Sequence, residues 1–143
     1  MQSHVKRFVL SILLIGDALA LLLFAYLGRR AHGLIDETWP AIGVLITAAE
    51  FTLPWVIVAW LLGAYPRGEV LSWSALLGRA LNAWLIAAPL GVLARAGVLG
   101  QAVIPVSFLI AALGFGGVIL LSWRMAFALI WRMMTSPRAQ EQP

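Results

Sequence analysis

The sequence predicts an all-α membrane protein, a single domain of four transmembrane helices. Three observations lead to this fold class. Hydrophobic residues make up 62% of the 143 residues and charged residues only 11%, whereas a soluble domain is roughly 45–50% apolar and about 25% charged. Four long apolar stretches follow one another, each long enough to cross a hydrocarbon core of about 30 Å. Short polar segments rich in Gly, Pro or Arg separate these stretches.

The first predicted helix spans about residues 8–28. Its apolar region is too long for a secretory signal peptide and contains Asp17, so we expect the helix to be retained. A carboxylate within a lipid-spanning helix is costly, which makes Asp17 a functional-site hypothesis. The helix ends in Arg29, Arg30 and His32, a candidate site for an anion or a lipid headgroup at the membrane surface. Alternatively, these side chains only end the helix.

The second predicted helix spans about residues 39–65. Trp39 and Pro40 suit a helix start, because Trp favours the membrane interface and Pro is tolerated in the first turn. The helix contains Glu50, and Pro54 is expected to kink it. Only Arg95, from the far end of the third helix, could reach Glu50; otherwise Glu50 should be protonated or face a water-filled pocket.

The third predicted helix spans about residues 71–96 and is the least apolar of the four. Asp17 and Arg79 enter the bilayer from the same side, and both lie about 12–15 Å along their helices. We therefore expect a buried ion pair between them, with Asn82 completing the hydrogen bonds. The pair would form either a proton or substrate site, or a purely structural contact that sets helix register.

The fourth predicted helix spans about residues 102–130 and is followed by a polar tail, 136–143. A continuous helix reaching Met134 would be about 50 Å long, which exceeds the hydrocarbon core of about 30 Å. We therefore expect the turns from Arg124 onward to emerge or to lie at the interface.

Small and polar residues recur at helical spacing on one face of each predicted helix. Such faces normally pack inward in a membrane bundle, so a polar line is expected between the four helices. The four faces comprise Leu14, Asp17, Leu21, Phe24 and Gly28; Gly43, Thr47, Glu50 and Pro54; Ala75, Arg79, Asn82, Ile86 and Pro89; and Ser107, Ala111, Gly114 and Val118.

The charge distribution predicts the orientation. Ten Lys and Arg exceed six Asp and Glu, and in membrane proteins such an excess gathers in cytoplasmic segments. Seven of the ten fall on the side that holds both termini, so we expect both termini in the cytoplasm and no nucleic-acid partner. These seven are Lys6, Arg7, Arg67, Arg79, Arg124, Arg132 and Arg138, against Arg29, Arg30 and Arg95 on the other side.

No catalytic motif stands out. The chain lacks cysteine, which excludes disulfides, thiolate metal sites and cysteine nucleophiles. It also lacks a histidine cluster, a P-loop, GxSxG and GxGxxG. His4 and His32 are single histidines at a membrane border, so we expect no metal or other cofactor. An enzyme that acts on lipid through the Arg29–His32 segment would lack a nucleophile, and we expect a protein that is not an enzyme.

The aspartate midway along the first helix, followed by the exit GRRAH, resembles the bacterial membrane-protein family called domain of unknown function 3054. The resemblance covers about residues 16–124. Glu50 is not part of the pattern associated with that family. The resemblance implies four helices in a bacterial inner membrane and brings no activity, substrate or cofactor. The later matching features are Phe24, Pro54, Trp55, Arg79, Trp84, Gly91 to Arg95, Ser107, Phe108, Trp123 and Arg124.

Two functional hypotheses follow. In the first, the protein binds or conducts a small molecule or ion at Asp17, Arg79 and Asn82, with Glu50 as an outer acidic position. Since four helices rarely enclose a pathway, this version needs a homo-oligomer or a membrane-protein partner. In the second, the chain is a non-enzymatic accessory or assembly subunit of a larger membrane complex, as its small-residue faces would allow.

Overall fold

The computed structural model describes residues 2–33, 39–66, 72–101 and 103–135. Helix makes up 88% of the structure, and the described residues contain no strand, which confirms the all-α class. The predicted tail, 136–143, lies outside the described residues. The elements are α1 (Gln2–Ala31), α2 (Pro40–Leu61), α3 (Trp73–Val98), α4 (Val106–Ala111), the π-helical turn η1 (Ala112–Gly116) and α5 (Gly117–Thr135).

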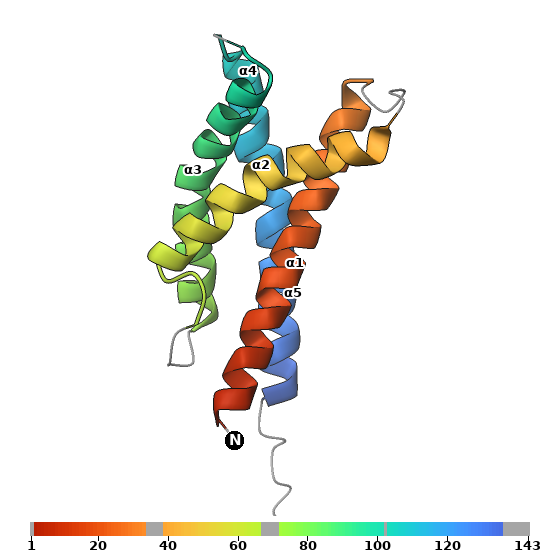
Figure 1. The fold of residues 1–143 in the computed structure, drawn as a ribbon. Coiled ribbons are helices and arrows are strands. Elements are labelled where there is room, and N and C mark those ends of the chain that lie inside the picture. The colour runs from red at the N-terminus through yellow and green to blue at the C-terminus, as the bar shows by residue number, and fades with distance from the viewer. Residues whose placement is uncertain (1, 34–38, 67–71, 102, 136–143) are drawn as a thin grey trace, which may run out of the picture.

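The described chain contains four helical segments that are long and apolar enough to cross a membrane, as expected for a multi-pass membrane protein. The fourth segment runs continuously through α4, η1 and α5. α1 and α5 lie side by side in opposite directions, while α2 crosses α1 obliquely and packs against α3 (Figure 1). α1 starts and α5 ends at the same end of the bundle (Figure 1). That this end is cytoplasmic remains a prediction.

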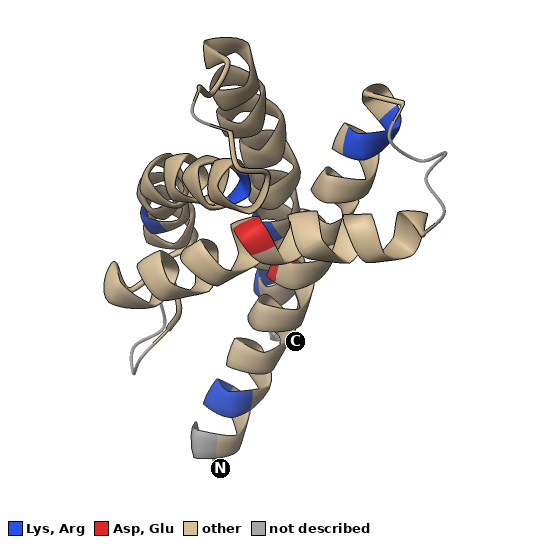
Figure 2. Cartoon of the chain, turned by 45° about the horizontal axis from the view of Figure 1, so that its top comes forward, with Lys and Arg blue, Asp and Glu red and all other residues tan. Residues whose placement is uncertain are grey.

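Charged positions are not confined to the ends of the bundle. Figure 2 shows acidic positions on the middle of the helices, with basic positions close to them. Asp17 and Glu50 are both buried, as the polar faces of the first two helices predict. Their partners, described below, decide what the interior can do.

The ends of the helices follow local sequence. Pro40 occupies the first turn of α2, as predicted. α2 ends at Leu61, four residues before the predicted end, because Gly63 adopts a left-handed conformation with φ of +67° that reverses the chain. This turn directs Ala64 and Tyr65 back into the core, where both are fully buried.

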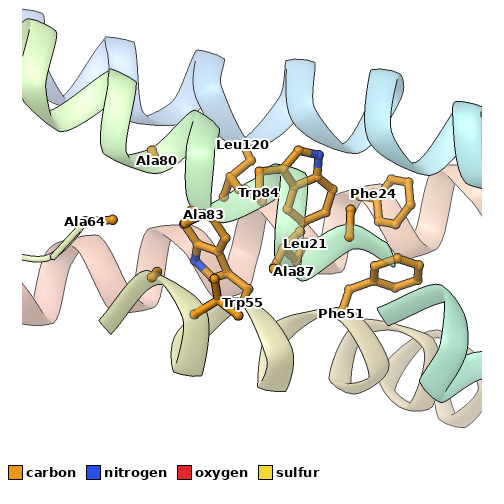
Figure 3. Close-up of a cluster of buried hydrophobic side chains, with 14 of the residues drawn as sticks. Leu21, Phe24, Phe51, Trp55, Ala64, Ala80, Ala83, Trp84, Ala87 and Leu120 are labelled. Carbon is orange, nitrogen blue, oxygen red and sulfur yellow. The ribbon is translucent and has the colours of Figure 1, made fainter. Parts of the chain in front are cut away.

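The core is built from large aromatic rings against small residues. Trp55 and Trp84 lie at its centre with Phe24 and Phe51 beside them (Figure 3). A Cβ atom added at Gly91 would lie 2.5 Å from a ring carbon of Phe51, so only glycine permits this approach of α2 and α3. In the same way, the absence of a Cβ atom at glycine lets Trp84 pack against η1 and Trp123 pack against α1.

The predicted inward faces are correct for the first two helices and wrong for the other two. α3 packs through alanines and glycine, whose small side chains allow α2 to approach closely. Close packing therefore outweighs polarity in choosing the buried face of α3. The residues predicted inward but found exposed are Arg79, Asn82 and Ile86 on α3, and Ser107, Ala111, Gly114 and Val118 on the fourth span.

The π-helical turn η1 explains part of the error in the fourth span. A π-turn adds one residue to the helix, so side chains beyond it face a different direction from those of an uninterrupted α-helix. In an uninterrupted helix that buries Ala112, Ile119 and Trp123 would follow on the same face. In the structure Leu120 and Arg124 are fully buried instead. The π-turn therefore carries Arg124 into the interior.

Candidate functional site

Asp17, on α1, is the centre of a buried polar network. Its side chain is 0% exposed. Its Oδ2 accepts hydrogen bonds from the indole Nε1 of Trp55 at 2.9 Å and from the hydroxyl of Tyr65 at 2.8 Å. α2 supplies the tryptophan, and the turn after Gly63 supplies the tyrosine. The carboxylate thus joins two segments that the Gly63 turn brings together.

Arg124, on α5, is the cation of this network and is also 0% exposed. Its Nη2 donates to Oδ2 of Asp17 at 2.6 Å and its Nε to Oδ1 at 3.1 Å. Its Nη1 donates to the main-chain carbonyl of Ala64 at 2.7 Å. The guanidinium also lies over the rings of Trp55 and Tyr65, with its Cζ 5.1 and 4.9 Å from their centroids. This two-point geometry is the strong form of an arginine–carboxylate contact.

The charged groups of this network find their partners within the protein. An unpaired charge at zero exposure would cost several kcal/mol, and here each charge meets its counterion and hydrogen bonds, while the cation also lies over two aromatic faces. Burial, and then the neighbouring charge of Asp17, raise the pKa of the Tyr65 phenol well above its usual value. Tyr65 therefore stays protonated and keeps donating to Asp17. The arrangement ties α1, α5 and the chain after α2 to one point.

The predicted ion pair between Asp17 and Arg79 is wrong. Arg124 occupies that role, and Arg79 instead donates to the main-chain carbonyl of Gly63 at 3.2 Å. Asn82, predicted to complete the pair, is exposed on the outer face of α3. Depth along the helices matched Arg79 to Asp17, but the buried face of α3 turns its side chain away from α1.

Three residues of the network were not predicted to belong to it. Arg124 was expected at the membrane interface, Trp55 was named only among the features that resemble the family, and Tyr65 only ended the second predicted helix. One signal was available. Arg124 enters from the same side as Asp17, so it could also match Asp17 in depth, but only the π-turn directs it inward.

Glu50, on α2, forms a second buried charged contact. Oε2 of Glu50 accepts a hydrogen bond from Nη1 of Arg95, on α3, at 3.1 Å, and the same nitrogen donates to Oγ1 of Thr47 at 2.8 Å. This confirms that Arg95 reaches Glu50 from the far end of the third helix. Arg95 also lies 5.9 Å from the ring centroid of Phe108. The second oxygen of Glu50, Oε1, is buried and has no hydrogen-bond partner among the described residues.

An apolar groove of about 360 Å³ runs between α2 and α3 beside Glu50. Pro54 lines this groove and lacks the N–H that would bond the Glu50 carbonyl in a regular helix. Glu50 therefore has two acceptors behind the wall of the groove, its Oε1 and its main-chain carbonyl, while the groove surface itself is wholly apolar. The other lining residues include Ala49, Leu53, Ile57, Leu90 and Ala94.

The cationic segment at the end of α1 is divided by the structure. Arg29 is buried with its guanidinium against Gly43 of α2, where a side chain larger than glycine would collide with it. Arg30 and His32 are exposed. The three side chains therefore do not share one environment. Across the described residues, no group of three His, Asp or Glu side chains is placed to hold a metal ion.

Comparison with known proteins identifies the family to which the chain belongs. The sequence pattern of a family described as "Protein of unknown function (DUF3054)" matches residues 14–127. The chain belongs to this family. No curated protein and no solved structure matches the chain significantly. The DUF3054 match spans the Asp17 network and the Glu50 contact, so both lie in the part of the chain that defines membership.

Proposed function

We propose that this DUF3054 protein binds a small amphipathic molecule from within the bilayer, at Glu50 and the groove between α2 and α3. One observation carries the proposal: Oε1 of Glu50 is buried beside an apolar groove and has no hydrogen-bond partner in the described chain. A buried acceptor without a donor costs roughly 1–3 kcal/mol. A ligand in the groove that brings a donor would remove this cost once the Glu50 side chain turns its Oε1 toward the groove.

The chemistry of the groove defines the class of ligand. Its lining is aliphatic, so it suits an alkyl chain or an apolar ring system. Arg95 already neutralises the charge of Glu50, and its guanidinium can only donate hydrogen bonds. The open position is therefore an acceptor, and it suits a head group that donates, such as an amine or a hydroxyl.

The Asp17 network supports a binding protein rather than a conducting one. Both its charges are fully buried and paired, and its hydrogen bonds end on groups of the same chain. A substrate or ion that passed between the helices at Asp17 would have to break the buried pair of Asp17 and Arg124, at a cost of about 3–5 kcal/mol. We assign a structural role to the Asp17 network and ligand binding to the Glu50 groove. The proposed function is not enzymatic.

Photolabelling of the protein in lipid nanodiscs tests the proposal. Two probes share a long alkyl chain with a diazirine, and one carries a primary amine while the other carries a methyl ketone, which only accepts. Wild-type protein should be labelled more strongly by the amine, at groove residues such as Leu53 and Leu90. In Glu50→Gln the amide oxygen keeps its bond from Arg95, so an N–H₂ donor takes the open position. The preference should then reverse to the ketone.

Arg30→Gln is the matched control, because it removes an exposed charge on α1, which does not line the groove, and should leave the preference of the wild type unchanged. Equal labelling by both probes, or a preference that survives Glu50→Gln, would refute the assignment of the groove.

A further inference from the structure

Asn82 is an exposed amide on the outer face of a membrane-spanning helix. It lies about 14 Å along α3 from Trp73, near the middle of a hydrocarbon core of about 30 Å. The structure gives its side chain no hydrogen bond within the described chain. Hydrocarbon offers it no water either, so an amide at this depth needs a partner from outside the chain.

Asn82 belongs to a regular seam along α3. Gly78 and Leu85 are exposed on the same face, and the half-buried Pro89 continues it, at spacings of four and three residues, the pattern of a helix-pairing seam. A Cβ added at Gly78 would meet no atom within 4 Å, so another helix backbone can approach there. Pro89 lacks the N–H that would bond the carbonyl of Leu85, which leaves a further acceptor on this face.

We propose that this seam is the interface of a homodimer, in which α3 packs against α3 of a second copy in the same orientation. A side-chain amide carries both a donor and an acceptor, so it is complementary to itself. A two-fold axis along the membrane normal places Asn82 of both copies at the same depth, where each amide can satisfy the other. Arg79, which flanks the seam, is held by Gly63 of its own chain.

The surface beside the seam fits this partner. An apolar groove of about 520 Å³ lies between α3 and the fourth span, and Gly78 and Leu85 border it as well as the seam. Leu81, Gly114 and Val118 also line it. The exposed leucines of a second α3 are side chains of the right chemistry to fill this groove.

Cysteine cross-linking tests the dimer directly, because the natural chain contains no cysteine. Leu85→Cys places a thiol on the seam without touching Asn82. Leu19→Cys places one on the exposed side of α1 as a matched control. In oxidised membranes Leu85→Cys should form a covalent dimer and Leu19→Cys should remain monomeric.

The role of Asn82 is tested in the Leu85→Cys background. Asn82→Leu should raise the monomer–dimer dissociation constant about tenfold, as expected for loss of interhelical hydrogen bonds, while Asn82→Gln should retain most of the affinity. An unchanged melting temperature would show that Asn82→Leu still folds. The proposal is overturned by equal cross-linking of the two cysteine variants, by cross-linking that Asn82→Leu does not reduce, or by capture of a different membrane protein at Leu85→Cys.

Discussion

The pairing of Asp17 with Arg124 makes the sharpest prediction about stability. Asp17→Asn keeps the shape of the side chain but removes its charge, which leaves Arg124 as an uncompensated cation at zero exposure. Breaking one partner of a buried pair costs about 3–5 kcal/mol. At about 2–4 °C per kcal/mol for a chain of this size, the melting temperature should fall by roughly 10 °C.

The assay is thermal unfolding of purified protein in lipid nanodiscs, followed by tryptophan fluorescence. Arg124→Gln should destabilise the protein to a similar degree as Asp17→Asn. The double variant should recover part of the loss, since two facing amides can bond each other, and a coupling of about 0.5–3 kcal/mol is expected for residues in contact. Arg79→Gln is the control and should change the melting temperature far less, because Arg79 is exposed.

The reasoning would be refuted by a neutral or stabilising Asp17→Asn, or by strictly additive effects in the double variant. Either result would mean that the buried pair does not hold the bundle. An effect of Arg79→Gln as large as that of Arg124→Gln would likewise contradict the assignment of the ion pair.

Two further predictions concern the surroundings of this pair. Tyr65→Phe removes one donor to Asp17 and should destabilise the protein by about 1–3 kcal/mol. Because the pKa of Tyr65 is raised in the folded state, the stabilisation that it contributes should be present below pH 10 and lost as the pH rises further. Melting curves of the wild type and the variant across alkaline pH would show this loss. Gly16→Ala would drive a Cβ into the ring of Trp123 and should cost about 1–3 kcal/mol, whereas Gly28→Ala, on the same helix but in open space, should be neutral or stabilising; equal melting temperatures for the two alanine variants would contradict this packing.

The fold was predictable because its main signal is local. The length and apolar character of each span are properties of consecutive residues, so composition and spacing predict four helices. The inward positions of Asp17 and Glu50 follow from the cost of a carboxylate in lipid. The contact between Arg95 and Glu50 could be predicted because both residues lie at a similar depth along their helices.

The partners of Asp17 depend on features that spacing does not reveal. The π-turn changes the direction of Arg124, and the left-handed turn at Gly63 sends Tyr65 inward. For α3, the preference for its polar face was misleading because alanines and glycine allow the closer contact with α2. A prediction that weighed small residues above polar ones would have placed Asn82 outside.

The contact between the first and last spans also constrains how the chain is made. Asp17 and Arg124 are separated by 107 positions, so the carboxylate enters the translocation machinery long before its counterion exists. At synthesis rates of about 5–20 residues per second, the interval is roughly 5–20 s. During this time Asp17 must keep contact with water or with another polar partner. The bundle can therefore fold completely only after the fourth span has been made. A chain truncated before Arg124 would leave Asp17 without its counterion.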